Sequence, residues 1–291
     1  MKHKLILLVA VFALLIAACA PDATEAPAEP IPAETNKLNV IVSIVPQKYF
    51  VERIGGDLVN VSVMVQAGES PATYEPKPEQ MVELTKAAAY VSIGVPFEKS
   101  WLEKFQAANP NMKMVDTTQG VERIATPDGG LNPHIWLSPS LVKIQSETIY
   151  NALVELDPAH EADYKSNLDA FIKDIDALDT EIRATLEKTA SKKFIVFHPA
   201  WGYFARDYGL QEIPIEVGGQ EPSAQELAKL ITMAKDENIK VVFVQPEFSQ
   251  EDAQTIAKEI GGEVLAINSL SPDWLANLQK VAETFAAVLN Q

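Results

Sequence analysis

Short apolar runs alternate with longer amphipathic segments along most of the chain, and this alternation predicts its strands and helices. In the first half, apolar runs typical of buried strands cover residues 38–45, 59–65, 90–93 and 112–115. Amphipathic stretches, expected to be helical, run from Pro46 to about Arg53, from Pro78 to about Ala88, and from Phe97 to Phe105. Strands that alternate with helices indicate a parallel sheet covered by helices on both faces.

The second half of the chain repeats this plan. Strands are expected at residues 194–197, 213–217, 241–244 and 264–267, with helices between them and a last helix at 272–289. We therefore predict an α/β fold with two lobes, each a parallel sheet flanked by helices. The expected bounds are 38–137 for the N-terminal lobe and 191–291 for the C-terminal lobe.

Residues 138–190, between the lobes, show helical patterns and no strand. Ser138-Pro139 and Asp157-Pro158 each place a capping residue before a proline, which is typical of a helix start. The second helix carries one apolar stripe at spacings of three and four: Tyr164, Leu168, Phe171, Ile175, Leu178, Ile182 and Leu186. From Pro158 to Thr189 this helix would be roughly 48 Å long. We expect it to join the two lobes as a long rigid rod.

The N-terminus has the pattern of an export signal. Basic residues at the start precede an unbroken apolar run from Leu5 to Ile16, and Ala17-Ala18-Cys19 follows. Because the run is short for a membrane span, we predict a signal peptide at 1–18 and a lipidated Cys19. The alternative is a plain secretory signal with an incidental cysteine. Residues 19–37, rich in Pro, Ala, Glu and Thr, are expected to form a disordered tether outside the cytoplasmic membrane.

Composition and charge exclude several classes of function. The 291 residues carry a formal net charge of -16 at pH 7, which argues against binding to nucleic acid or broad adsorption to anionic lipid. The single cysteine rules out a disulfide framework and any site built from several thiolates. Without the signal, the chain is long enough for two lobes, and 47% hydrophobic residues can fill a substantial core.

Two of the four histidines lie in matching contexts. His134 and His198 each adjoin a proline, and each precedes a tryptophan by two or three residues at a junction of strand and helix. Neutral imidazole is a common metal ligand, and loops at strand ends can direct two of them into one cleft. The alternative is a pair of hydrogen-bonded histidines in a cleft that binds something else. Trp136, Trp201 and Tyr203 are expected to be packing residues.

These motifs resemble segments of the metal-specific solute-binding proteins of bacterial ABC importers, the zinc and manganese cluster. The segments are NPHIWLSP around His134, FHPAWGYFARDYGL around His198, EPSAQEL at 221–227 and QPEFS at 245–249. The resemblance covers essentially the whole chain. It implies a monomeric, non-enzymatic receptor that is anchored outside the membrane and delivers metal to a permease and its ATPase. His134 and His198 take the positions of family ligands.

The sequence departs from the family at two expected ligand positions. Ala72 replaces the usual first histidine, and Asn268 replaces the usual last aspartate. The loop at 125–131 is short and contains no histidine. Besides Asn268, carboxylates close to these motifs in the sequence are candidates for additional ligands: Glu75, Glu216 and Glu247. With two imidazoles we expect zinc as the transported ion, since manganese favours more carboxylate oxygens.

Two other classes of function remain open at this point. The same fold could bind a different metal, a metal chelate or another small solute, because two family ligands are replaced. A zinc hydrolase is a remote alternative, since it would need an open metal position and a general base. The sequence contains neither HExxH nor GxSxG, and no GxxxxGK[ST] loop for ATP.

Overall fold

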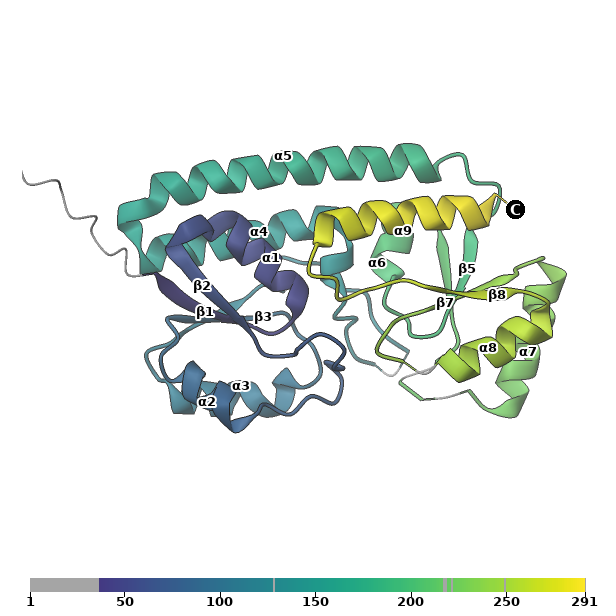
Figure 1. Ribbon diagram of the computed structural model, residues 1–291, viewed down its shortest axis with the longest axis horizontal. Coiled ribbons are helices and arrows are strands. Elements are labelled where there is room, and N and C mark those ends of the chain that lie inside the picture. Colours follow the sequence, from purple (N-terminus) through teal and green to yellow (C-terminus); the bar gives the residue numbers. More distant parts are fainter. Residues whose placement is uncertain (1–36, 128, 217–218, 221, 249, 291) are drawn as a thin grey trace, which may run out of the picture. The chain divides into compact units, whose positions relative to one another are not determined.

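Two parallel four-stranded sheets form the framework of the computed structural model (Figure 1). The structure describes residues 37–127, 129–216, 219, 220, 222–248 and 250–290. The predicted signal peptide, Cys19 and all of the tether except Lys37 lie outside these residues. In the described part of the chain, no helix combines the length and the hydropathy needed to cross a membrane.

The two sheets have the same strand order. The N-terminal sheet is ordered β2-β1-β3-β4, with strands β1 (Leu38–Val42), β2 (Val59–Val63), β3 (Ala89–Ser92) and β4 (Lys113–Asp116). The C-terminal sheet is ordered β6-β5-β7-β8, with strands β5 (Lys193–Val196), β6 (Gln211–Pro214), β7 (Val241–Val244) and β8 (Glu263–Ala266). All neighbouring strands are parallel. The predicted sheet type is therefore confirmed in both halves.

Helices cover the sheets, which explains why β3 and β7 are buried along their whole length. The N-terminal sheet is accompanied by α1 (Val45–Gly55), α2 (Pro78–Leu84) and α3 (Glu98–Ala108). The C-terminal sheet is accompanied by α6 (Gly202–Asp207), α7 (Ala224–Asp236) and α8 (Gln250–Ile260). Three longer helices complete the fold: α4 (Pro139–Leu156), α5 (Glu161–Leu186) and α9 (Trp274–Leu289).

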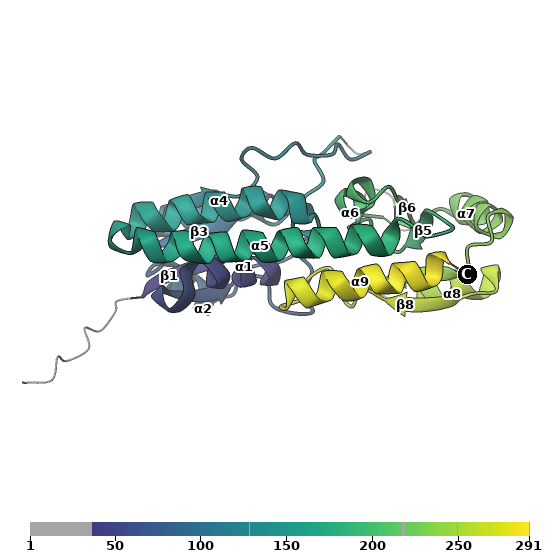
Figure 2. The same ribbon diagram turned by 90° about the horizontal axis from the view of Figure 1, so that it is seen from above.

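Helix α5 links the two halves. It packs against α4 and α1 along one part and against α9 along another, as Figure 2 shows from above. Every residue of the predicted apolar stripe is buried: Tyr164, Leu168, Phe171, Ile175, Leu178, Ile182 and Leu186. The long connecting helix is thus confirmed. The predicted lobe bounds at 137 and 190 stay a prediction.

The expected start of α5 at Pro158 is wrong by three residues. Pro158–His160 forms a 3-10 turn, and the α-helix begins at Glu161. The Asp157 carboxylate does not cap the helix, because it accepts hydrogen bonds from His160 Nδ1 (2.6 Å) and the Tyr164 hydroxyl (2.9 Å). With 26 residues, α5 is about 39 Å long, shorter than predicted. By contrast, Ser138 caps α4 as expected and accepts from the backbone N–H of Leu141.

Hydrogen bonds of amide side chains mark the ends of two other elements, which are shorter than predicted. The first strand ends at Val42 instead of Val45, because Gln47 Oε1 accepts the backbone N–H groups of Ser43 (3.0 Å) and Ile44 (3.3 Å). Helix α2 ends at Leu84 instead of Ala88. There, Asn109 Nδ2 donates to the carbonyls of Leu84 (3.0 Å) and Ala87 (2.9 Å).

One apolar core runs through both halves. Its centre holds the rings of Phe50, Phe171 and Trp274, from α1, α5 and α9, with centroids 5.2–6.3 Å apart. Burying one such side chain stabilises a fold by about 1.5–3 kcal/mol. Two indoles reinforce the junction, since Trp136 Nε1 donates to Ser269 O and Trp274 Nε1 donates to Trp136 O, both at 2.6 Å.

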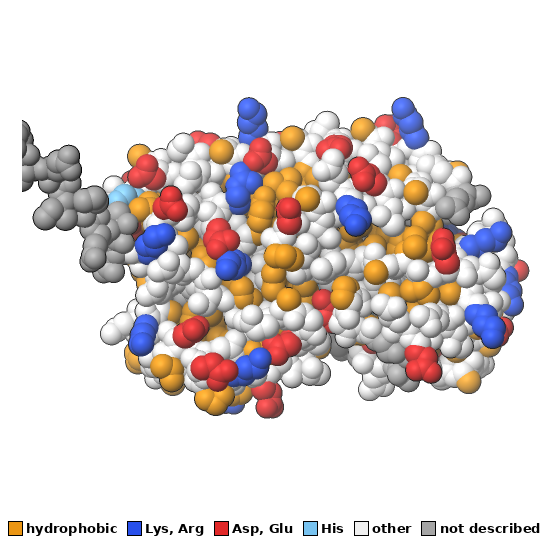
Figure 3. Space-filling view, in the orientation of Figure 1, with side chains coloured by type: hydrophobic (Ala, Val, Ile, Leu, Met, Phe, Trp, Pro, Cys, Tyr) orange, Lys and Arg blue, Asp and Glu red, His pale blue; other side chains and the backbone are white. Residues whose placement is uncertain are grey.

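The surface carries charges of both signs. On the face shown in Figure 3, Asp and Glu side chains are interspersed with Lys and Arg. Exposed ion pairs also occur within the described residues, such as Lys143 with Asp176 (2.7 Å). Such exposed pairs contribute about 0–1 kcal/mol each, so they serve solubility more than stability.

Candidate functional site

His198 follows β5, at the point in the C-terminal sheet where the chain connections leave two neighbouring strands, β5 and β7, in opposite directions. Strand β5 continues to β6 on one side, while its other neighbour is β7. The loops that follow β5 and β7 therefore diverge at the carboxyl ends of these strands, which is where open α/β sheets bind ligands. The β5 loop carries His198, and the β7 loop carries Gln245, Glu247 and Phe248.

His134 reaches the same place from the connection between the two sheets. It directly precedes a 3-10 turn at Ile135–Leu137. The segment before it is held by α6, since the Tyr203 hydroxyl donates to Asn132 O (2.9 Å) and accepts from Ile124 N (2.9 Å). Trp136, Trp201 and Tyr203 are all buried, which confirms their expected packing role.

The two imidazoles face each other through their Nε2 atoms, which lie 3.4 Å apart. Two nitrogens bound to one tetrahedral zinc ion, at 2.0–2.1 Å each, would be separated by about 3.3–3.4 Å. The spacing between His134 and His198 therefore matches that of two ligands on a single ion.

The hydrogen bonds of the rings leave both Nε2 atoms free to bind a cation. His134 Nδ1 lies 2.8 Å from Asn132 Oδ1, and His198 Nδ1 lies 2.6 Å from Glu216 Oε2. Asn132 Oδ1 also accepts from the backbone N–H of His134 (2.9 Å), which fixes it as an oxygen acceptor. Both Nδ1 atoms therefore carry hydrogen, and in neutral rings two Nε2 lone pairs meet at close range. A shared cation or proton would relieve this repulsion.

The surroundings hold both rings in place and favour the neutral form of His134. Phe248 stacks on His198 with centroids 4.6 Å apart and planes at 16°. The side chain of Gln245 accepts from His198 N (3.4 Å) and donates to His198 O (2.7 Å). Burial lowers the pKa of His134 well below its ordinary value of 6.5, and nearby His198 and Arg123 lower it further. The neutral ring is the form that binds metal.

The other predicted ligand candidates are placed differently. Ala72 and Glu75 lie on exposed parts of the loop between β2 and α2. Asn268 Oδ1 already accepts from Leu270 N (2.8 Å). The carboxylate of Glu216 lies at Nδ1 of His198, on the ring edge away from the facing Nε2 atoms.

Glu247 differs from these candidates, because its Oε2 is buried and makes no hydrogen bond within the described residues. The same residues contain no ready-made group of three or more His, Cys, Asp or Glu side chains that could hold a metal ion. The structure therefore brings His134 and His198 together without a third ligand of these types already in place.

Sequence reasoning missed the side chains that orient the two histidines. Asn132 stands two residues before His134, so its position in the same motif was an available signal. Gln245 and Phe248 belong to the QPEFS segment, which carried a resemblance but no assigned role. Their contacts with His198 depend on the pairing of β5 with β7, which the sequence does not display.

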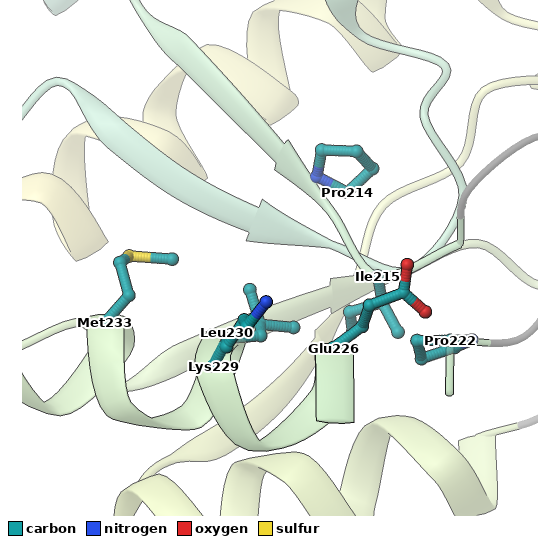
Figure 4. Close-up of a pocket in the computed structure, with 7 residues that line it drawn as sticks. All are labelled: Pro214, Ile215, Pro222, Glu226, Lys229, Leu230 and Met233. Carbon is teal, nitrogen blue, oxygen red and sulfur yellow. The ribbon is translucent and has the colours of Figure 1, made fainter. Parts of the chain in front are cut away.

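A separate pocket lies on the C-terminal lobe beside β6 and α7 (Figure 4). Its volume is about 300 Å³, and it is lined by Pro214, Ile215, Pro222, Glu226, Lys229, Leu230 and Met233. The lining is mostly apolar, and the Glu226 carboxylate accepts from Ser223 N (2.8 Å) and Ser223 Oγ (2.6 Å). Neither histidine lines this pocket, and its chemistry does not suit a cation.

Comparisons with known proteins show which family the chain resembles. The family model of the zinc-uptake complex component A, periplasmic, matches residues 40–288. The high-affinity zinc uptake system protein ZnuA of Bacillus subtilis (strain 168) is 31% identical over 274 residues, covering 88% of this chain and 85% of the relative. The iron-binding protein YfeA of Yersinia pestis is 30% identical over 287 residues, covering 92% of each chain.

A solved structure supports the same conclusion. The crystal structure of ZnuA has 50% sequence identity and a TM-score of 0.86, and covers 88% of this chain and 100% of that chain. This likeness confirms the predicted two-lobe α/β fold. The resemblance inferred from the motifs around His134 and His198 is confirmed as well.

Proposed function

Because the chain belongs to the family of the periplasmic zinc-uptake complex component A, we propose that it captures zinc outside the cytoplasmic membrane for an ABC importer. In this proposal the ion is cargo. His134 and His198 bind it through Nε2, and the protein passes it to a permease driven by a cytoplasmic ATPase. The protein acts as a receptor and catalyses no reaction.

The observation that carries the proposal is the pair of Nε2 atoms 3.4 Å apart, each on a ring whose Nδ1 is bound to an oxygen. This arrangement fixes the tautomer and the direction of both rings before an ion arrives. Preorganised rings lose little freedom on binding, which favours affinity.

Zinc is the preferred cargo because both proposed ligands are imidazoles. Zinc binds nitrogen ligands readily in tetrahedral sites, whereas manganese favours carboxylate and water oxygens. Iron is a competitor to test, since one relative is named an iron-binding protein. Water or a mobile side chain would complete the coordination.

A metal chelate is the second candidate cargo. The exposed position of Ala72 and the internal hydrogen bond of Asn268 leave two coordination positions without an evident protein ligand. A small chelator could supply donor atoms there. Titration with zinc alone and with zinc plus free histidine or citrate separates the two cases, because a chelate receptor binds tightly only in the presence of the chelator.

The proposed location follows from the N-terminus. Residues 1–18 would direct export, Cys19 would carry lipid, and residues 19–37 would tether residues 38–291 to the membrane. The divisions at 38–137, 138–190 and 191–291 belong to the same proposal. Because α5 packs on both α1 and α9, we expect only small lobe movements when metal binds.

The test of the proposal is a zinc titration of the purified protein after treatment with a chelator, against a chromophoric competitor. We expect one tight site, lost in the His134→Ala/His198→Ala double variant. His160→Ala is the matched control, because His160 pairs with Asp157 and not with the site. Equal binding by the double variant and the wild type would refute the assignment.

A further inference from the structure

We propose that Glu247 is the third protein ligand, and that its carboxylate moves onto the metal ion when the ion reaches His134 and His198. This inference rests on the proposed capture of metal at the two histidines. It goes beyond that function by naming a protein group that supplies a further ligand where Ala72 and Asn268 supply none.

The loop that carries Glu247 is fixed to His198 on both sides of the glutamate. On one side, Gln245 bonds to the backbone N–H and carbonyl of His198 at 3.4 and 2.7 Å. On the other, the Phe248 ring stacks on the His198 imidazole at 4.6 Å. Glu247 is therefore held in the neighbourhood of the proposed ligand by contacts that do not involve its own carboxylate.

The carboxylate of Glu247 has a buried oxygen with no hydrogen-bond partner within the described residues. Glu98, by comparison, has a backbone donor for each of its oxygens, Ile93 N (3.0 Å) for Oε1 and Gly94 N (2.7 Å) for Oε2, whereas the Glu247 carboxylate accepts, among the described residues, only from its own backbone N–H. Burying a polar oxygen without a partner destabilises a fold, because the oxygen loses its hydrogen bonds to water. An arriving cation would remove that cost.

Charge supports the same assignment. Two neutral imidazoles leave the charge of a divalent ion uncompensated, and Glu216 balances only part of it through His198. A second carboxylate, that of Glu247 with its buried Oε2, would bring the charge of the loaded site close to neutral, which favours an ion held away from water.

The other candidates fit the role less well. Glu75 is exposed on the loop between β2 and α2, and Asn268 Oδ1 is engaged with Leu270 N. Glu216 is engaged with His198 Nδ1. Because no three-residue ligand set is preassembled in the described part of the chain, the proposal requires a movement of the Glu247 side chain on loading.

The experiment compares zinc affinity in Glu247→Gln, Glu75→Gln and the wild type by competition with a chromophoric chelator. Glu247→Gln keeps the size of the side chain and removes the charge, and Glu75→Gln makes the same change at an exposed site. We expect Glu247→Gln to raise the zinc dissociation constant at least about tenfold, since substitution of residues that only support metal ligands already costs that much affinity. Glu75→Gln should change the dissociation constant less than about twofold.

Thermal unfolding of the same proteins, with and without zinc, separates a ligand from a merely structural residue. If Glu247 binds the ion, Glu247→Gln leaves the metal-free protein as stable as the wild type or more so, and reduces the zinc-induced rise in Tm. Unchanged zinc affinity in Glu247→Gln would overturn the inference while leaving the histidine site intact. Absence of zinc binding by the wild type would overturn both.

Discussion

The carboxylate of Glu216 offers a sharp test of how the site is organised. It is 8% exposed, and its Oε2 lies 2.6 Å from Nδ1 of His198. We expect Glu216→Ala to weaken zinc binding, because His198 loses the partner that fixes its tautomer and direction.

The size of the effect follows from that contact. A hydrogen bond to a charged group contributes about 1.5–3 kcal/mol, and each 1.4 kcal/mol corresponds to a factor of ten in affinity. Loss of the Glu216 bond should therefore raise the dissociation constant roughly 10- to 100-fold, the range seen for groups that support metal-bound histidines. Glu216→Gln keeps an acceptor oxygen and should lose less.

The assay is zinc competition with a chromophoric chelator on folded variants, checked by circular dichroism. Glu237→Ala is the matched control, because it removes a carboxylate from the same lobe that pairs with Lys193 at 2.6 Å. We expect that control to bind zinc like the wild type. If Glu216→Ala also binds like the wild type, the Nδ1 contact has no part in holding the ligand, and the reasoning is refuted.

Three further predictions concern pH, packing and location. Burial raises the pKa of Glu212 from 4.5 to about 7, so its contribution to stability is fully present below pH 4.5 and is lost as pH rises through 7. Urea unfolding should show that Glu212→Gln becomes more stable relative to the wild type between pH 4.5 and 7, by at most roughly 3 kcal/mol in the free energy of unfolding. If the free energies of the two proteins change in parallel with pH, the effect is excluded. Phe171→Ala should lower the free energy of unfolding by about 3–5 kcal/mol, because Phe171 is fully buried. The control Val82→Ala, at an exposed position, should lower it by under about 0.5 kcal/mol. Equal losses in the two variants would contradict the proposed packing of Phe171. Cys19→Ser should move the protein from the membrane to the soluble fraction after cell fractionation, and persistence in the membrane would rule out a lipid anchor at this residue.

Periodicity predicted the fold well because both halves bury complete strands and one helix carries a continuous stripe. The run of apolar positions from Tyr164 to Leu186 needs no knowledge of its neighbours to be recognised. The ends of elements were less accessible, since they depend on distant side chains. Asn109 ends α2 through the carbonyls of Leu84 and Ala87, more than 20 residues earlier in the chain.

The site was predictable in part for the same reason. His134 and His198 stand out because their local motifs match, and the structure brings their Nε2 atoms to 3.4 Å. From the sequence, Glu216 was a candidate only because it lies close to the family-like motifs. Its contact with His198 arises because β6 lies beside β5, which places the residues after each strand side by side.

The most direct test of the account is zinc X-ray absorption spectroscopy on the loaded protein. We expect two imidazole rings bound through nitrogen at about 2.0–2.1 Å, with the remaining ligands oxygen and none of them sulfur. His134→Ala and His198→Ala should each remove one imidazole from the spectrum. A loaded wild type whose spectrum contains no imidazole scattering would contradict the central claim that these two histidines hold the ion.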